Sequence, residues 1–175
     1  MQKNWYIVYT KPKSEKKVAA LLTKKKIENF CPLNCKSIVQ FRKSKLVYEP
    51  LFSSYVFVNL EESEINLLRQ IENVVSLVFW KGRPAVIYHE EIEAIKEFTG
   101  DHQNIKLEKT QVNLNGEPKA GDDRSYSIDG KILIIKNKSI RVNLPSLGFT
   151  LVAELEGESV LGREVSFGNK EFSLQ

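Results

Sequence analysis

Side chains capable of metal binding or acid/base chemistry gather at two places in the chain. His89 is followed at once by Glu90 and Glu91, a mixture that occurs in metal sites and in general acid/base sites. Cys31 and Cys35 are separated by three residues, and closely spaced cysteines are typical zinc ligands. Cys31 could also act as a nucleophile if a basic group lay beside it.

The elements that would position these groups argue against both chemistries. The glutamates open a segment with helical spacing, where carboxylates stabilise the positive end of the helix dipole. The cysteines lack a second pair, and the histidines, His89 and His102, are too few and too badly spaced to complete a zinc site. The G-x-S-x-G, H-E-x-x-H and glycine-rich phosphate-binding motifs do not occur. We therefore expect no enzyme activity, no metal and no cofactor, with Cys31 and Cys35 as buried free thiols.

The chain is long enough for one large or two small domains. It has 175 residues, and a hydrophobic content of 42% is enough for a buried core. Its apolar runs are far shorter than the roughly 20 residues that a membrane helix needs. The first residues show no pattern of an export signal. We expect a cytoplasmic protein with no membrane partner.

Positive charge is concentrated near the start of the chain. Residues 1–50 hold 12 Lys or Arg against three Glu, a net +9, whereas the remaining residues hold 14 against 19 Asp or Glu, a net −5. Phosphate binding by counterion release depends on clustered cations rather than on the total charge. The first 50 residues are therefore where a nucleic acid would bind.

The basic cluster begins with a predicted strand and helix. Residues 5–9 are aromatic and β-branched, which is typical of a strand, and Pro12 ends it. Ser14 can cap a helix that buries Val18, Leu21 and Leu22 on one side. The opposite side of that helix presents four lysines, Lys13, Lys16, Lys17 and Lys24. Such a face is either simply solvated or a binding surface.

Two further strands are predicted at residues 30–41 and 46–60, joined by the polar hairpin tip of residues 42–45. Alternation in the second strand places Tyr55 and Phe57 on one face and Val56 and Val58 on the other. Because both faces are apolar, either the domain covers both, or it covers one and a partner binds the other.

The rest of the chain predicts an α+β sandwich followed by a small β-barrel. Residues 63–71 and 90–98 have helical periodicity, residues 74–80 read as a strand, and residues 82–84 as a turn. Residues 101–110 are polar and are interpreted as a linker. Beyond them, short strands at residues 131–136, 139–144 and 149–155 alternate with turns. We predict domains at residues 1–100 and 111–175.

Four blocks in this order resemble the N-terminal domain of the NusG family of transcription elongation and antitermination factors. They are WYIVYTKPKSEKK (residues 5–17), FCPL (30–33), EPLFSSYVFVNLE (49–61) and VVSLVFWKGRPAVI (74–87). The segment FWKGRPAVI is most similar to the specialised RfaH-like and UpxY-like antiterminators of polysaccharide operons. The resemblance covers roughly the first hundred residues.

This resemblance implies a fold and a partner. It implies an antiparallel sheet sandwiched by helices, then a degenerate KOW-type, SH3-like barrel in which residues 116–121 and 130–132 match opening loops and residues 122–129 are an insertion. It also implies binding to the clamp helices of RNA polymerase, which keeps the clamp closed and suppresses pausing and termination. The positions that match the aromatic docking patch are Tyr9, Phe52, Tyr55 and Phe57.

The resemblance implies a second partner, the exposed non-template DNA strand. Lys11, Lys13 and Lys17 match the basic residues that contact it, and we expect phosphate contact rather than base-specific reading because Pro12 and Leu21 replace polar or basic groups. The basic surface extends to Lys16, Lys24, Arg42, Lys43 and Lys45.

Two alternatives remain open from the sequence. KOW-like barrels also occur in ribosomal proteins, so the chain could be an RNA-binding module associated with the ribosome. Alternatively, it could be an adaptor whose lysines only solubilise it. The aromatic patch favours the polymerase-binding factor, because a pure RNA binder has no need for apolar residues on both faces of residues 55–58. The barrel itself could bind a ribosomal protein or another factor, or cover the first domain.

Overall fold

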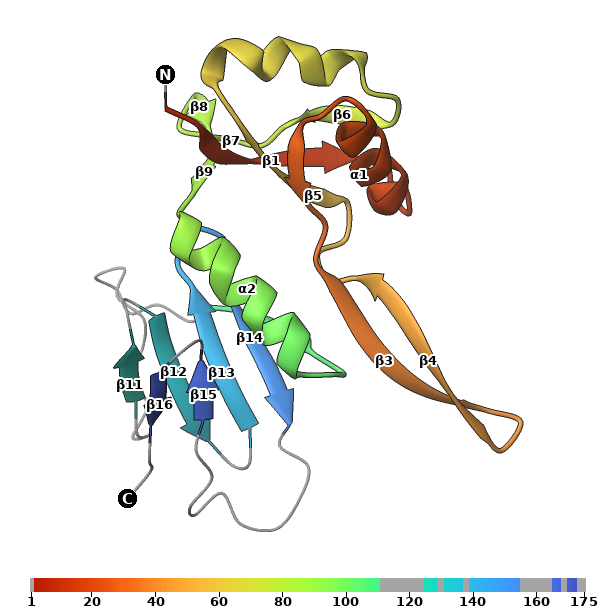
Figure 1. The fold of residues 1–175 in the computed structure, drawn as a ribbon, viewed down its shortest axis with the longest axis vertical. Coiled ribbons are helices and arrows are strands. Elements are labelled where there is room, and N and C mark those ends of the chain that lie inside the picture. Colours follow the sequence, from red (N-terminus) through yellow and green to blue (C-terminus); the bar gives the residue numbers. More distant parts are fainter. Residues whose placement is uncertain are drawn as a thin grey trace.

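The computed structural model describes the backbone of residues 2–110, 125–128, 131–136, 139–154, 165–167 and 170–172, and the side chains of residues 2–110 and 139–154. Two sheets lie at opposite ends of the molecule, with helix α2 (His89–Asp101) running between them and a long hairpin projecting from the side (Figure 1). The expected opening loop at residues 116–121 and residue 130 of the one at 130–132 lie outside the described residues.

The first sheet is antiparallel and has the order β2-β5-β1-β6, with β9 also paired to β1. Its strands are β1 (Asn4–Thr10), β2 (Glu28–Phe30), β5 (Tyr55–Leu60), β6 (Val74–Leu77) and β9 (Val86–Ile87). Helix α1 (Glu15–Lys24) covers one face, where its Val18 and Leu22 pack with Val56 and Val58 of β5. The predicted first strand, lysine-rich helix and α+β class are confirmed.

The cap of α1 differs from the prediction. Ser14 occupies the N-cap position but its side chain makes no capping hydrogen bond, because its backbone lies near φ −105°, ψ 1° rather than in the extended region that aims the hydroxyl at the first turn. Instead, the buried carboxylate of Glu15 accepts a hydrogen bond of 2.6 Å from the backbone N–H of Ser54. The start of α1 is thereby fixed to the loop before β5.

The two long strands predicted at residues 30–41 and 46–60 are each interrupted. β2 ends at Phe30, and the chain then passes Pro32 into β3 (Leu33–Gln40). β4 (Lys43–Pro50) pairs with β3 as a separate two-stranded ribbon that projects from the body (Figure 1). Because Gln40 pairs with Lys43, the turn consists of Phe41 and Arg42 alone, so the expected tip at residues 42–45 is corrected.

The segment between β5 and α2 also differs in detail. The helix predicted at residues 63–71 is present as the 3₁₀-helix η1 (Glu62–Gln70). The strand predicted at residues 74–80 divides into β6 and β7 (Phe79–Trp80), and β7 pairs with β8 (Arg83–Pro84) in a small hairpin. Helix α2 buries Ile92, Ile95 and Phe98, as its periodicity predicted. Among the described residues, no helix has the length and apolar character needed to cross a membrane.

The second sheet is antiparallel and has the order β10-β14-β13-β12-β11. Its strands are β10 (Lys106–Lys109), β11 (Ser125–Ile128), β12 (Lys131–Lys136), β13 (Ser139–Leu144) and β14 (Phe149–Glu154), and a separate pair follows, β15 (Val165–Phe167) and β16 (Lys170–Phe172). Strand β10 lies within residues 101–110, the expected linker, and pairs with β14. The expected insertion at residues 122–129 likewise contains β11. The KOW-type barrel and the two-domain division stay predictions.

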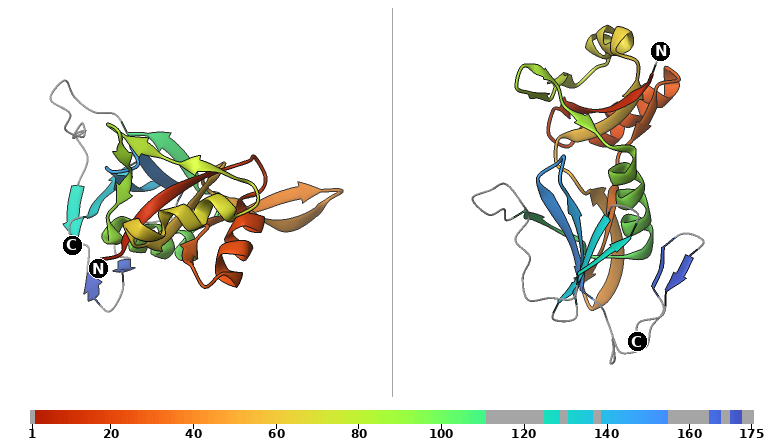
Figure 2. Two further views of the ribbon diagram at one scale, coloured as in Figure 1. Left: turned by 90° about the horizontal axis from the view of Figure 1, so that it is seen from above. Right: turned by 90° about the vertical axis from the view of Figure 1, so that its left-hand side faces the viewer.

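One core cluster joins the two sheets. Trp5, Phe52 and Phe57 of the first half belong to the same buried cluster as Ile140 and Leu151 of the second. Helix α2 contributes to this cluster and lies beside the second sheet in both figures (Figures 1 and 2). Both apolar faces of β5 are thus covered within the chain, one by α1 and the other by α2 and the second sheet.

Candidate functional site

The four aromatic residues predicted as a docking patch lie together. The β1–β5 register pairs Tyr9 with Tyr55, and their rings meet edge to face with centroids 6.0 Å apart. Phe52, in the loop before β5, meets Phe57 edge to face at 5.5 Å. Alternation along the strands keeps Tyr9, Tyr55 and Phe57 on one face of the sheet. The structure therefore brings the predicted residues into one aromatic cluster.

Only part of this aromatic cluster is accessible. Tyr9 is 39% exposed and Tyr55 is half-buried, whereas Phe52 is 3% exposed and Phe57 is fully buried. Phe30 stacks on Phe57 with centroids 6.3 Å apart, and Phe149 of β14 contacts Phe52 at 6.2 Å. Phe52 and Phe57 are thus core residues in this arrangement, because α2 and the second sheet cover them.

Polar contacts around α2 help to hold the two halves together. The Glu91 carboxylate accepts a hydrogen bond of 2.9 Å from the backbone N–H of Ser146, in the turn between β13 and β14. Glu91 also accepts from the backbone N–H of Tyr88 at the start of α2. This placement supports the structural interpretation of the acidic cluster. Within the described residues, no group of three or more His, Cys, Asp or Glu side chains is placed to hold a metal ion.

The predicted lysines of the first helix lie on an exposed surface. Lys11, Lys13 and Lys24 are exposed. Lys17 forms an exposed ion pair with Glu72, Nζ to Oε1 2.8 Å, and this hydrogen bond lowers the pKa of the Glu72 carboxyl. Lys16 donates a hydrogen bond of 2.6 Å to the backbone carbonyl of Tyr48 in β4.

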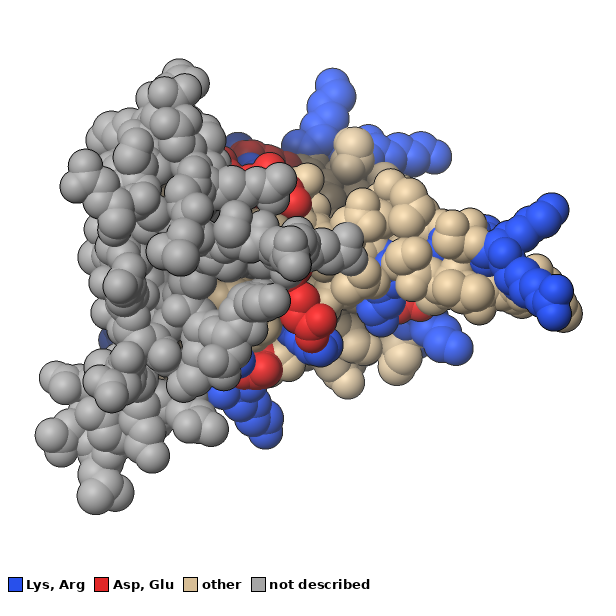
Figure 3. All heavy atoms as spheres, turned by 90° about the horizontal axis from the view of Figure 1, so that it is seen from below, with Lys and Arg blue, Asp and Glu red and all other residues tan. Residues whose placement is uncertain are grey.

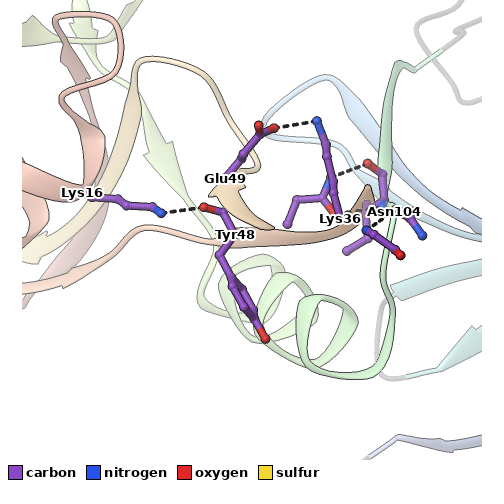
Figure 4. A network of polar contacts seen from close by, with 8 residues as sticks. Lys16, Lys36, Tyr48, Glu49 and Asn104 are labelled. Atoms are coloured by element: carbon purple, nitrogen blue, oxygen red, sulfur yellow. Dashed lines mark hydrogen bonds and ion pairs between the residues drawn. The ribbon is translucent and has the colours of Figure 1, made fainter. Parts of the chain in front are cut away.

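A polar network connects α1 with the base of the hairpin (Figure 4). Besides the Lys16 contact, Lys36 of β3 forms an ion pair of 2.7 Å with Glu49 of β4. Asn104, just before β10, also contacts this ribbon. Its backbone N–H donates a hydrogen bond to the Cys35 carbonyl, and its side-chain oxygen accepts one from the backbone N–H of Ser37. These contacts fix the base of the ribbon, with Lys16 of α1 bound directly to β4.

The remaining predicted cations lie at the far end of the ribbon. Arg42 is in the turn, and Lys43 and Lys45 are opposite Gln40 and Ile38 on one face of the ribbon. All three cations are exposed, and basic side chains gather at that end of the molecule (Figure 3). The predicted basic residues therefore form two groups, one on α1 and one at the hairpin tip.

Sequence reasoning missed several exposed aromatic residues. Phe41 in the hairpin turn is 92% exposed, and Phe79 and Trp80 of β7 are also exposed. The sequence pattern does not predict their exposure, because it places Phe41 at the end of a strand and the other two within a longer strand. The adjacency of Phe41 to Arg42 and Lys43 was the one signal available.

The two cysteines are free, as expected, with Cys35 buried and Cys31 half-buried. Burial, together with the nearby Glu15 carboxylate, raises the pKa of the Cys31 thiol to about 11. A thiol with so high a pKa is almost wholly protonated at neutral pH and is a poor nucleophile.

The fold and its surfaces define an α+β domain with an aromatic cluster on one face of its sheet and two groups of exposed basic residues, one on α1 and one at the hairpin tip. Residues 3–96 match the NusG family, described as transcription termination factor NusG. Because the match spans more than half of the chain, the protein belongs to the NusG family of transcription factors.

Comparison with solved structures agrees with this fold. A structure of Thermotoga maritima NusG, described as showing domain interaction, is 24% identical, with 89% of this chain and 94% of that chain covered and a TM-score of 0.51. At this identity the likeness shows the fold alone. The MjSpt4:Spt5 complex in conformation A is 16% identical, with coverages of 86% and 99% and a TM-score of only 0.32. No curated protein matches the chain.

Proposed function

We propose that this protein is an operon-specific elongation and antitermination factor of the RfaH-like or UpxY-like kind, which binds the clamp helices of RNA polymerase and suppresses pausing and termination. The observation that carries the proposal is the aromatic cluster of Tyr9, Phe52, Tyr55 and Phe57 on one face of a NusG-family sheet. Rigid aromatic side chains provide large contact area at low entropic cost, which suits them as anchors in a protein interface.

Docking of the whole aromatic cluster requires the second sheet to move away. Phe149 covers Phe52, and buried residues of β13 and β14 share a core with Phe57. Only molecules in which this cover has opened would present all four anchors. The apparent dissociation constant for polymerase would then be the intrinsic value divided by the open fraction. The second sheet would in this way regulate binding.

The basic surface would hold nucleic acid beside the polymerase. Lys11, Lys13 and Lys17 lie at the start of α1, where they would contact phosphates of the non-template DNA strand. Lys17 would exchange its exposed contact with Glu72 for a phosphate. Exposed ion pairs of this kind contribute little to stability because solvent screens them, so the exchange is energetically accessible.

Capture of RNA polymerase by the tagged protein tests the proposal. The double variant Y9A/Y55A removes the accessible half of the aromatic cluster, and we expect it to lose polymerase while remaining folded. Tyr88, an exposed tyrosine at the start of α2, provides the matched control Y88A. Capture of ribosomes in place of polymerase, or equal polymerase capture by Y9A/Y55A and wild type, would contradict the proposal.

A further inference from the structure

The turn of the β3–β4 hairpin carries residues that its backbone does not favour. Phe41 and Arg42 have φ values of 51° and 61°, so both lie in the left-handed region. Two-residue hairpin turns with positive φ at both positions strongly prefer Asn-Gly, because other residues are strained there. Strain of this kind that persists at an exposed position is a reason to look for a function.

The side chains at this tip are suited to an aromatic ligand that carries negative charge. Phe41 is 92% exposed and Val39, two residues before it, is 79% exposed. Residues 35–48 include four cations and no Asp or Glu, so the ribbon has a local charge of +4. The cations are Lys36, Arg42, Lys43 and Lys45. The nearest carboxylate along the chain, Glu49, is at the base of the ribbon and is paired with Lys36.

We propose that Phe41 stacks on an unpaired base of a single-stranded nucleic acid while Arg42, Lys43 and Lys45 contact its phosphates. This inference rests on the proposed nucleic-acid contact of those three cations and adds the class of ligand. Every base offers a π face to an aromatic side chain, so such stacking tolerates any sequence. A closed duplex keeps the faces of its bases stacked inside, so it offers Phe41 no π face, although its phosphates stay available to the same cations.

The position of the ribbon supports this ligand. Its base is held by the Lys16 and Asn104 hydrogen bonds, whereas the tip projects away from both sheets (Figures 1 and 4). A strand that contacts the lysines of α1 can therefore continue along the ribbon to Phe41. A protein partner would need several carboxylates placed opposite these three neighbouring cations. A nucleic acid meets the same need with its regularly spaced phosphates.

The first test measures binding of the full chain to labelled oligonucleotides. The probes are a single-stranded DNA, a single-stranded RNA of the same sequence and a blunt DNA duplex. We expect F41A to bind single strands about tenfold more weakly or worse, and duplex unchanged, because one base stack is lost. F79A, which makes the same truncation at an exposed site outside the ribbon, should match wild type, and F41W should restore binding. The two single-stranded probes distinguish DNA from RNA as the source of the bases.

A second variant separates this function from folding. F41N/R42G installs the turn residues that the backbone prefers, so its melting temperature should equal or exceed that of wild type. Its affinity for single strands should nevertheless fall at least as far as that of F41A. A variant of this kind that kept its affinity would overturn the proposal.

Two other results would also overturn the inference. One is an equal loss of single-strand and duplex binding by F41A, which would leave only phosphate attraction at the tip. The other is an F41A protein that binds oligonucleotides like wild type but no longer captures polymerase freed of nucleic acid. That result would show that the tip contacts a protein. The proposed function is tested separately, because Y9A/Y55A should lose polymerase and still bind single strands like wild type.

Discussion

Phe149 of β14 packs edge to face against Phe52 of the first half, with ring centroids 6.2 Å apart and an interplanar angle of 68°. Phe52 in turn meets Phe57 at 84°, so three rings run from the second sheet to the centre of β5. Two of the four residues proposed to bind polymerase, Phe52 and Phe57, therefore also hold the two halves of the chain together. Binding and closure compete for one surface.

This competition predicts that F149A increases binding to polymerase. The truncation removes the ring that covers Phe52, which raises the open fraction and lowers the apparent dissociation constant by up to about tenfold if the closed form dominates. A capture titration against polymerase measures the change. F79A is the matched control, because it makes the same truncation at an exposed site outside the core. Unchanged affinity in a folded F149A protein would show that the closed arrangement does not limit binding.

A second prediction concerns Phe57, which lies in the centre of the core. Because Phe57 is fully buried between Phe30 and Phe52, F57A should lower the free energy of unfolding by about 3–5 kcal/mol, as expected for a buried Phe to Ala truncation. Urea denaturation measures this, with F79A expected to stay within about 0.5 kcal/mol of wild type. The sequence pattern alone predicts that Y55A/F57A loses polymerase without unfolding. Because Phe57 is buried, the structure predicts instead that this double variant is less stable than wild type.

Local patterns predicted the elements whose residues carry their own signal. The alternation at residues 55–58 predicts a strand with two apolar faces, and the structure confirms it because α1 and the second sheet cover one face each. The spacing of Val18 and Leu22 likewise predicts the buried side of α1. What the alternation left open was whether a partner or the chain itself covers Phe57.

Elements fixed by distant partners were not predictable in this way. Strand β10 has one apolar residue, Leu107, among three charged ones, so it resembles a linker until β14 supplies its hydrogen-bonding partner. The turn at Phe41 and Arg42 has neither glycine nor asparagine, the usual signals of a two-residue hairpin. The burial of Phe52 depends on Phe149, which lies almost a hundred residues away in the sequence.

The lysines of α1 give a prediction about salt. Charge reversal at Lys11, Lys13 and Lys17 should weaken nucleic-acid binding and reduce the slope of log affinity against log salt by roughly one unit for each lost phosphate contact. E72Q should have the opposite effect on affinity, because it frees Lys17 from its ion pair. The matched reversal of Lys81, an exposed lysine in the β7–β8 turn, should leave the slope unchanged. An unchanged slope after reversal of all three α1 lysines would mean that this face is only solvated.

The Glu72–Lys17 ion pair also predicts how that binding depends on pH. Lys17 lowers the pKa of Glu72 below its ordinary value of 4.5, so the stabilisation from this pair is present above that value and is lost as the pH falls through the lowered pKa. Between pH 6 and about 8, Glu72 stays ionised and E72Q should differ from wild type by a constant factor. Titration of oligonucleotide affinity across this range checks the prediction. A difference that disappeared at pH 6 would show that Glu72 is not the group that competes for Lys17.

Cys31 gives the last prediction, a test of the packing between α1 and β2. Its thiol pKa of about 11 results chiefly from burial and then from the charge of Glu15, so the thiolate is scarce near neutral pH. In a C35S variant, which leaves Cys31 as the single cysteine, alkylation at pH 8 should be about 100-fold slower than in the denatured chain, because reactivity follows the thiolate fraction. The rate should continue to rise up to about pH 11, whereas an exposed cysteine levels off near 9. A plateau near pH 9 in the folded protein would mean that Cys31 is solvated and that α1 does not pack on β2 as described.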